Sequence, residues 1–271
     1  MLNFVDKSSF VIQTECSLSI QANLNGFSFC ITNAAGLCSA LVSKDYSKPV
    51  FSYDDLASEL YEIFDTEPLL RKRYAATYCM FISNKAMLMP SALLNREQLR
   101  ICLERVVSLD DLDEIHYRNT VLPEAMAVFA IPSPLAGIVV QYHPNTVFMH
   151  QHLPLLSYLS TCVERQRAAL YVEGNVATIA LFCNNQLVLT NAFLIESFTD
   201  ALYYLTFATK EWEIDPAFLS LYFTGYIQEE HKELLKKYYP MVNFLTATMP
   251  LLVGKVAAIR YQPLYVLHKC E

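Results

Sequence analysis

The sequence contains very little glycine. It has 6 glycines in 271 residues, whereas an average protein has about 7%. They are Gly26, Gly36, Gly137, Gly174, Gly225 and Gly254, and they do not cluster. Loops that cradle phosphates need clustered glycines, because only a residue without a Cβ atom lets the backbone approach the anion. The sequence therefore excludes both the Walker A loop and the dinucleotide-binding glycine fingerprint.

Positive charge is also scarce. The chain has 20 Lys and Arg residues against 27 Asp and Glu residues, a net charge of -7, which argues against a nucleic-acid-binding protein. Charged residues make up 17% of the chain and hydrophobic residues 54%. This composition excludes a disordered chain, and the length fits one large domain or two medium ones.

Cysteine pairs and targeting signals are absent. The eight cysteines form no CxxC pair and lie mostly in apolar stretches, which is typical of core thiols in a reduced compartment. Residues 1–7 show no signal-peptide pattern. The longest apolar stretches, 121–142 and 240–259, are interrupted by prolines, which argues against a membrane-spanning helix. We therefore expect a cytoplasmic protein with no membrane span.

The first half of the sequence predicts a meander followed by a helix. Three runs alternate apolar and polar residues around turn signals and are expected to be strands: 16–22, 27–33 and 37–42. Ser52 and Asp55 form a capping-box pattern before a helix expected over 53–65. Two further runs, 74–82 and 85–89, are predicted to form another strand pair.

The same order returns in the second half of the sequence. Strands are predicted over 168–173, 176–183, 186–195 and 218–224, and a charged helix near 228–238. Ser197 and Asp200 repeat the capping box before a helix expected over 198–210. This repetition, about 150 residues apart, indicates a duplicated domain rather than a solenoid. We place the division in the proline-rich stretch 132–144, giving halves of 1–134 and 135–271.

The duplicated pattern resembles the ribonuclease H-like fold of the actin, Hsp70 and sugar kinase superfamily. The segment LYVEGNVATIALFCNNQLVLTNAFLIESFTDALYYL is similar to part of the actin-like proteins of pilus assembly and type II secretion. The whole chain, including MAVFAIPSPLAGIVVQYHPNTVFMHQHLPLL, resembles a family of uncharacterised Bacteroidetes proteins with an actin-like ATPase fold. The resemblance implies an α/β fold of two α+β halves, each with a mixed sheet.

The resemblance also implies where a nucleotide site would lie. In active members the first hairpin carries an Asp, any residue and a Gly, where this chain has Gln21-Ala22-Asn23. In the second half Val172 replaces the Asp, although Gly174 keeps the turn glycine. The residues that would form the remaining cofactor site are Asn23, Asn25, Gly174, Asn175, Thr178 and Gly225. The alternative is that these are ordinary hairpin turns, which Gly and Asn readily form.

Three functions follow from this site. The leading hypothesis is a non-catalytic interaction or scaffold protein with a degenerate nucleotide site, no cofactor, no catalytic residue and an unidentified protein partner. The alternative is an actin-like ATPase that binds ATP with magnesium and uses Glu173, Asn175 or Thr178 as substitute ligands. A small-molecule kinase is the third, although no general-base Asp can be placed. The oligomeric state stays open between a monomer and a dimer.

Other groups of polar or aromatic residues favour structural explanations. His143, His150 and His152 could hold a metal, but they are expected at a solvent-facing boundary where a strand ends and a helix begins. The acidic cluster Asp110, Asp111, Asp113 and Glu114 is expected to be a solvated cap rather than an acid/base pair. Tyr203-Tyr204 and Tyr238-Tyr239 would bind a partner if exposed, but core packing is favoured.

Overall fold

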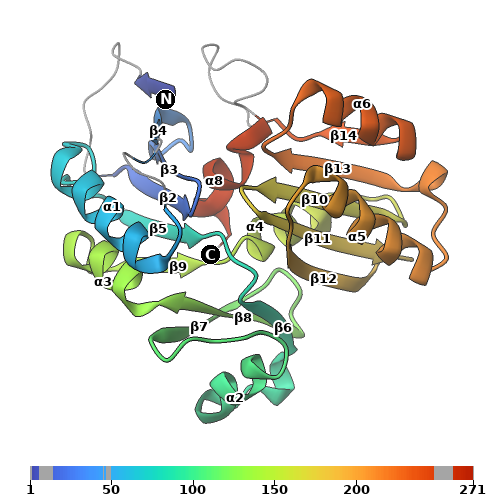
Figure 1. Cartoon of the computed structure of the whole chain (residues 1–271), viewed down its shortest axis with the longest axis horizontal. Coiled ribbons are helices and arrows are strands. Elements are labelled where there is room, and N and C mark those ends of the chain that lie inside the picture. The colour runs from blue at the N-terminus through green and yellow to red at the C-terminus, as the bar shows by residue number, and fades with distance from the viewer. Residues whose placement is uncertain (1, 6–14, 45, 47–49, 247–258, 271) are drawn as a thin grey trace.

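The protein has two main β-sheets, each covered by helices on its outer face (Figure 1). The computed structural model describes residues 2–5, 15–44, 46, 50–246 and 259–270. A smaller third sheet projects from the first half. The Met1–Lys7 segment and the 240–259 stretch considered above lie partly outside the described residues.

The first sheet has six strands in the order β1-β4-β3-β2-β5-β9. They are β1 (Leu2–Val5), β2 (Ser17–Asn23), β3 (Gly26–Thr32), β4 (Cys38–Lys44), β5 (Ala76–Phe81) and β9 (Thr146–Met149). β2, β3 and β4 are antiparallel neighbours, whereas β5 runs parallel to both β2 and β9. Helices α1 (Tyr53–Thr66) and α3 (Ser133–Tyr142) cover one face of this sheet (Figure 1).

The second sheet repeats this arrangement in the order β12-β11-β10-β13-β14. Its strands are β10 (Arg167–Glu173), β11 (Val176–Cys183), β12 (Gln186–Leu194), β13 (Ser220–Gly225) and β14 (Val242–Phe244). Helices α5 (Phe198–Glu211) and α6 (Glu229–Tyr238) lie on its outer face (Figure 1). In each sheet three consecutive strands form a meander, β2–β4 in the first and β10–β12 in the second, and the next strand along the chain pairs in parallel with the first strand of the meander. The predicted duplication is therefore confirmed.

An insertion between β5 and β9 carries the third sheet, of order β6-β8-β7. The strands of this sheet are β6 (Ala86–Pro90), β7 (Asp113–Asn119) and β8 (Ala125–Pro132). Helix α2 (Leu99–Glu104) lies between β6 and β7 in the sequence. The prediction that 85–89 pairs with 74–82 is wrong, because β6 pairs with β8 instead. β5 has β2 on one side and β9 on the other, so neither of its edges is open to a hairpin partner.

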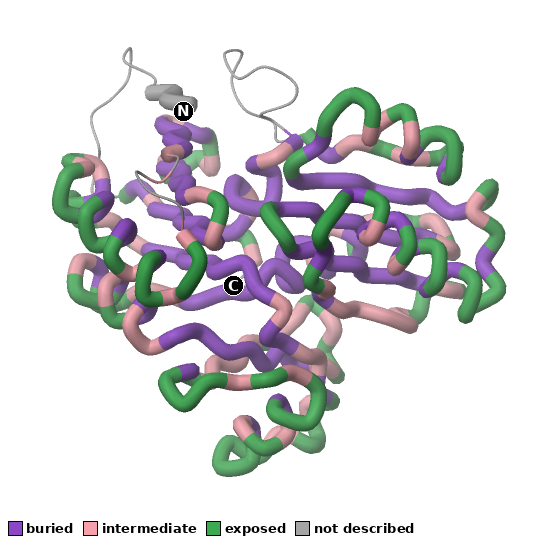
Figure 2. Tube along the Cα trace, viewed as in Figure 1, coloured by how far each residue is buried: buried purple, intermediate pink, exposed green. Residues whose placement is uncertain are grey.

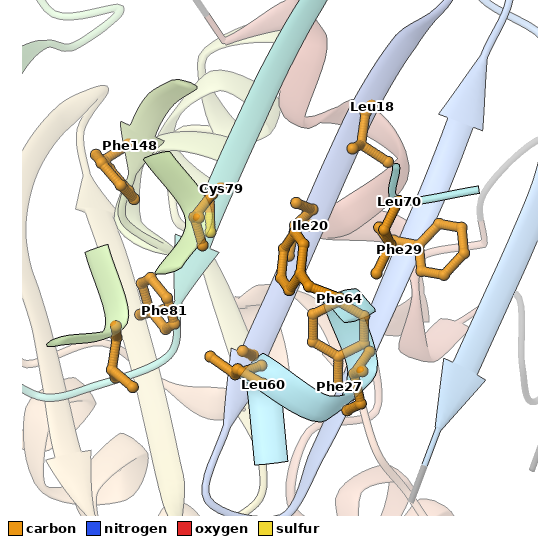
Figure 3. Packing of buried hydrophobic residues seen from close by; sticks show 14 of the residues in the cluster. Leu18, Ile20, Phe27, Phe29, Leu60, Phe64, Leu70, Cys79, Phe81 and Phe148 are labelled. Carbon is orange, nitrogen blue, oxygen red and sulfur yellow. The ribbon is translucent and has the colours of Figure 1, made fainter. Parts of the chain in front are cut away.

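Both predicted capping boxes start the helices that cover the sheets. The Ser52 hydroxyl accepts from the Asp55 amide at 3.1 Å, and the Asp55 carboxylate accepts from the Ser52 amide at 3.1 Å. At the start of α5 the Asp200 carboxylate accepts from the Ser197 amide at 2.8 Å. Further along α1, Leu60 and Phe64 pack over Phe27 and Ile20 (Figure 3). The amphipathic spacing seen in the sequence therefore fixes which face of α1 meets the sheet.

The inner faces of the two main sheets share a buried layer (Figure 2). Tyr78 and Met80 from β5 contribute to it together with Ala169 and Tyr171 from β10 and with α4 (His152–Thr161). α8 (Gln262–Val266), near the C-terminus, packs against the first sheet, where Tyr265 donates a 2.7 Å hydrogen bond to the Gly36 carbonyl. The last helix therefore ties the end of the chain to the first half.

The two sheets do not divide at residue 134, where the sequence expectation placed the boundary between the halves. β9, which ends at Met149, belongs to the first sheet, and the second sheet begins at Arg167. The change of sheet falls between them, in the segment that contains α4. Among the described residues, no helix is both long and apolar enough to span a membrane.

Candidate functional site

Two hairpin turns, one from each half, meet beside a single cavity of about 530 Å³. The β2–β3 turn contributes Asn25, and the β10–β11 turn contributes Gly174 and Asn175. Asn23 stands at the base of the first turn, where its side-chain oxygen accepts a 2.7 Å hydrogen bond from the Asn25 amide. The structure thus brings together four of the six residues that the sequence indicated.

The tips of the two turns pack directly against each other. Gly174 has a φ of 60°, a left-handed conformation that side chains disfavour. A Cβ atom at this position would collide with the side-chain nitrogen Nδ2 of Asn25 and would lie 3.3 Å from Cγ of Asn25 and 3.5 Å from Nδ2 of Asn23. Asn25 therefore occupies the space directly above Gly174.

The other two candidate residues lie elsewhere. Thr178 is fully buried inside β11, where its hydroxyl accepts a 3.3 Å hydrogen bond from Gln151. Gly225 ends β13 with a φ of 105°, pressed against the backbone of Val172. The next residue, Tyr226, donates its amide to the Val172 carbonyl at 2.7 Å and lines the cavity. Gly225 therefore sets the close approach of two strands, and neither it nor Thr178 lines the cavity.

An ion pair between the buried Glu173 and the partly exposed Arg260 forms one wall of the cavity. Glu173, 1% exposed, receives hydrogen bonds from Arg260 at 2.6 Å from Nη2 and at 3.1 and 3.2 Å from Nε. Burial disfavours the charged form of Arg260, but its hydrogen bonds to Glu173 outweigh this effect and raise the pKa of the guanidinium. Sequence reasoning missed Arg260, which is 87 residues away. The signal available was Glu173 itself, since a carboxylate inside a buried strand needs a cationic partner.

Aromatic rings form much of the remaining cavity lining, and few of the lining residues are positively charged. The rings of His231 and Phe198 stack with centroids 4.3 Å apart, and Arg260 lies over the ring of Tyr226 at 5.5 Å. The backbone amides of Glu196 and Ser197, just before α5, already donate to the Asp200 carboxylate. The described lining residues include the carboxylates of Glu173 and Glu196 and the guanidinium of Arg260. A polyphosphate needs a concentration of positive charge around it, and this lining does not supply one.

Comparison with known proteins identifies the family. The model of a family described as protein of unknown function (DUF3822) matches residues 6–242. The chain belongs to this family. No curated protein matches the DUF3822 chain.

Solved structures similar to the DUF3822 chain share its fold. A Bacteroides thetaiotaomicron protein with actin-like ATPase fold and unknown function is 22% identical, with a TM-score of 0.76 over 97% of this chain and 99% of that one. The PilM-PilN type IV pilus biogenesis complex gives 14% identity and a TM-score of 0.59 over 93% and 98%. The cytoplasmic domain of EpsL, of the Vibrio cholerae type II secretion system, gives 10% and 0.45 over 95% and 96%. The match to the Bacteroides thetaiotaomicron structure confirms the predicted actin-like ATPase fold.

Two histidines of the DUF3822 chain lie deep between its sheets, which corrects the expectation of a solvent-facing boundary. His150 and His152 are 1% and 0% exposed, and their ring centroids lie 4.5 Å apart. Burial lowers the pKa of both, and that of His152 falls to about 4. The predicted strand end and helix start are correct, but the junction lies in the buried layer shared by both sheets.

The buried histidines make the stability of the fold sensitive to acid. The pKa of His152 is about 4 in the folded state and about 6.5 when unfolded. The unfolded state therefore binds more protons between these values, and stability present above pH 6.5 is lost as the pH falls toward 4. At 1.36 kcal/mol for each pKa unit, His152 alone is expected to account for about 3 kcal/mol.

Urea unfolding at pH 7 and pH 4.5 measures this effect. A His152→Leu variant should lose about 2–3 kcal/mol less between the two pH values than the wild type does. His231→Leu is the matched control, because His231 lies outside the buried layer between the sheets and its substitution should keep the acid sensitivity that His152 causes. An unchanged pH dependence in His152→Leu would contradict the assignment.

The acidic cluster is only partly the solvated cap that the sequence suggested. Asp113 is buried, and its carboxylate accepts a 2.6 Å hydrogen bond from Lys85, which also contacts Asp110 at 2.6 Å. Asp110, Asp111 and Asp113 line a separate cavity of about 410 Å³. No cluster of three or more potential metal-binding His, Cys, Asp or Glu side chains occurs in the described parts of the chain.

Proposed function

We propose that this DUF3822 protein is a non-catalytic scaffold of actin-like fold, which binds a protein partner and no longer uses a nucleotide. The observation that carries the proposal is that two of the three substitute ligands, Glu173 and Thr178, already have hydrogen-bond partners within the protein. An ATPase without the usual Asp residues would need Glu173, Asn175 or Thr178 to hold magnesium or its waters. Glu173 is held by Arg260, and Thr178 is buried and bonded to Gln151.

The contact between the hairpin turns supports the same proposal. In active members of the superfamily resembled here, the glycine turn binds phosphate, so the space above it has to be open. In this chain the side chain of Asn25 fills the space above Gly174. A phosphate could reach Gly174 only after the exposed side chain of Asn25 moved away.

Exposed aromatic side chains on α5 support the binding of a protein partner. Tyr203 and Phe207, one turn apart on α5, are 63% and 53% exposed, and their rings lie 6.3 Å apart. Tyr204 between them stacks on Phe193 of β12 at 4.2 Å, so one ring anchors the group while two face the solvent. Exposed aromatic groups are enriched in protein interfaces. The PilM relative was solved in a protein complex, and the eight free cysteines fit a reducing cytoplasm.

Calorimetric titration with ATP, in magnesium and in EDTA, tests the nucleotide part of the proposal. We expect no heat of binding for the wild type, for Glu173→Gln or for Glu196→Gln. Glu196→Gln is the matched control, since Glu196 is an exposed carboxylate of the same cavity. Magnesium-dependent binding that is weakened by Glu173→Gln and kept by Glu196→Gln would establish the ATPase alternative instead.

Site-specific photo-crosslinking tests the partner part. A crosslinkable residue at position 203 is expected to give a discrete adduct in cell extract. The same residue at Tyr61, a 52% exposed tyrosine on α1, serves as control and should give none. Equal labelling from both positions, or no adduct from either, would remove α5 as the partner surface.

A further inference from the structure

Two cysteines on neighbouring strands lie in van der Waals contact. The sulfur atoms of Cys30 on β3 and Cys38 on β4 are 3.4 Å apart. A disulfide bond is about 2.05 Å long, so a movement of little more than about 1 Å would join them. The strands have a register irregularity between Ile31 and Thr32, next to Cys38, where the backbone departs from regular pairing.

The environment gives the two thiols different roles. The thiol of Cys30 donates to the sulfur of Cys38, which lowers the pKa of Cys38 and raises that of Cys30. Cys38 follows the exposed turn that ends at Leu37 and is 3% exposed, whereas Cys30 is completely buried. A small oxidant arriving from the turn therefore meets Cys38 first.

We infer that Cys30 and Cys38 form a reversible dithiol–disulfide pair that reacts with hydrogen peroxide. The Cys38 sulfur attacks one peroxide oxygen and breaks the O–O bond, which gives a sulfenic acid on Cys38 and one water. The Cys30 sulfur then attacks the Cys38 sulfur, the S–O bond breaks, and a second water leaves. Overall, two thiols and one peroxide become one disulfide and two waters, and a small thiol reductant such as glutathione reverses the change.

The pair lies beneath the helix that joins the end of the chain to the first half. Cys30 and Cys38 pack in one cluster with Tyr261, Leu264 and Tyr265 of α8 and its N-cap. Tyr261 directly follows Arg260, the partner of Glu173. The disulfide would therefore form under the segment that carries Arg260, which lines the cavity.

Treatment of the full-length, reduced protein with stoichiometric hydrogen peroxide tests the inference. We expect an intact mass lower by two hydrogens, six titratable thiols in place of eight, and a cross-link between the peptides on either side of a chymotryptic cut after Leu37. Dithiothreitol should restore all eight thiols. Oxidation at other cysteines, or oxidation of Cys38 to the sulfinic acid without a cross-link, would overturn the inference.

Single variants separate the two roles. In Cys30→Ala, the reaction should stop at a Cys38 sulfenic acid, which dimedone traps. In Cys38→Ala no cross-link should form and Cys30 should stay reduced. Cys79→Ala is the matched control, because Cys79 is an equally buried thiol on β5 whose removal should leave the cross-link intact. A Cys30→Ala protein that resists dimedone as fully as Cys38→Ala would contradict the order of attack, and loss of the cross-link in Cys79→Ala would contradict the assignment of the pair.

Discussion

Gly225→Ala is expected to lower the free energy of unfolding by at least about 4 kcal/mol. A Cβ atom at Gly225 would collide with the Val172 carbonyl oxygen and stand 2.8 Å from the Val172 amide nitrogen and carbonyl carbon. These are backbone atoms of the central strand β10, so they cannot rotate away. The φ of 105° adds strain for any residue with a side chain.

Gly137→Ala is the matched control for this substitution. Gly137 lies in α3, and a Cβ there would meet no atom within 4 Å. Alanine in a helix is more stable than glycine by about 0.5–1 kcal/mol, so this variant should be slightly stabilised. Urea unfolding of the two variants checks the pair. A loss below about 1 kcal/mol in Gly225→Ala would show that β10 and β13 do not approach as closely as described.

Arg260→Leu is expected to cost about 3 kcal/mol, because it leaves the carboxylate of Glu173 buried without its partner. The Glu173 side chain is only 2% exposed, so Arg260 supplies hydrogen bonds that a leucine cannot replace. The double variant Glu173→Gln with Arg260→Leu should recover part of this loss, since it removes the buried charge. A double-mutant cycle from urea unfolding gives the coupling energy.

An exposed ion pair provides the comparison for Arg260. Lys236 and Glu233 on α6 lie 2.7 Å apart, with side chains 53% and 71% exposed. Lys236→Leu should change the stability by no more than about 0.5 kcal/mol. If Arg260→Leu costs as little, then Glu173 is reached by water and is free to bind another ligand, and the proposed function loses its main support.

Local sequence signals were enough to predict most of the fold. The two capping boxes placed the starts of α1 and α5 at the correct residues, because a helix start depends on side chains only three positions apart. The strand runs were also local, and β11 has the predicted bounds of 176–183. The partner of β6 was not predictable in this way, since both edges of β5 are filled by strands distant in sequence.

From the sequence, only those residues of the site that belong to hairpin turns could be predicted. Asn23, Asn25, Gly174 and Asn175 belong to two turns whose residues are recognisable in the sequence, and the resemblance to the actin superfamily implied that these turns form one site. Arg260 comes from a distant segment with no motif around it, so its pairing with Glu173 depends on the tertiary fold. The buried positions of His150 and His152 likewise follow from how the two sheets pack, which no local pattern encodes.

The thermal unfolding of the wild-type protein with millimolar ATP and magnesium tests the central claim most directly. A ligand at 100 times its Kd stabilises the native state by about 2.7 kcal/mol, which raises the midpoint of unfolding by several degrees. The engagement of Glu173 by Arg260 and the filling of the space above Gly174 by Asn25 predict no shift relative to ATP with EDTA. A magnesium-dependent rise of several degrees would contradict the account.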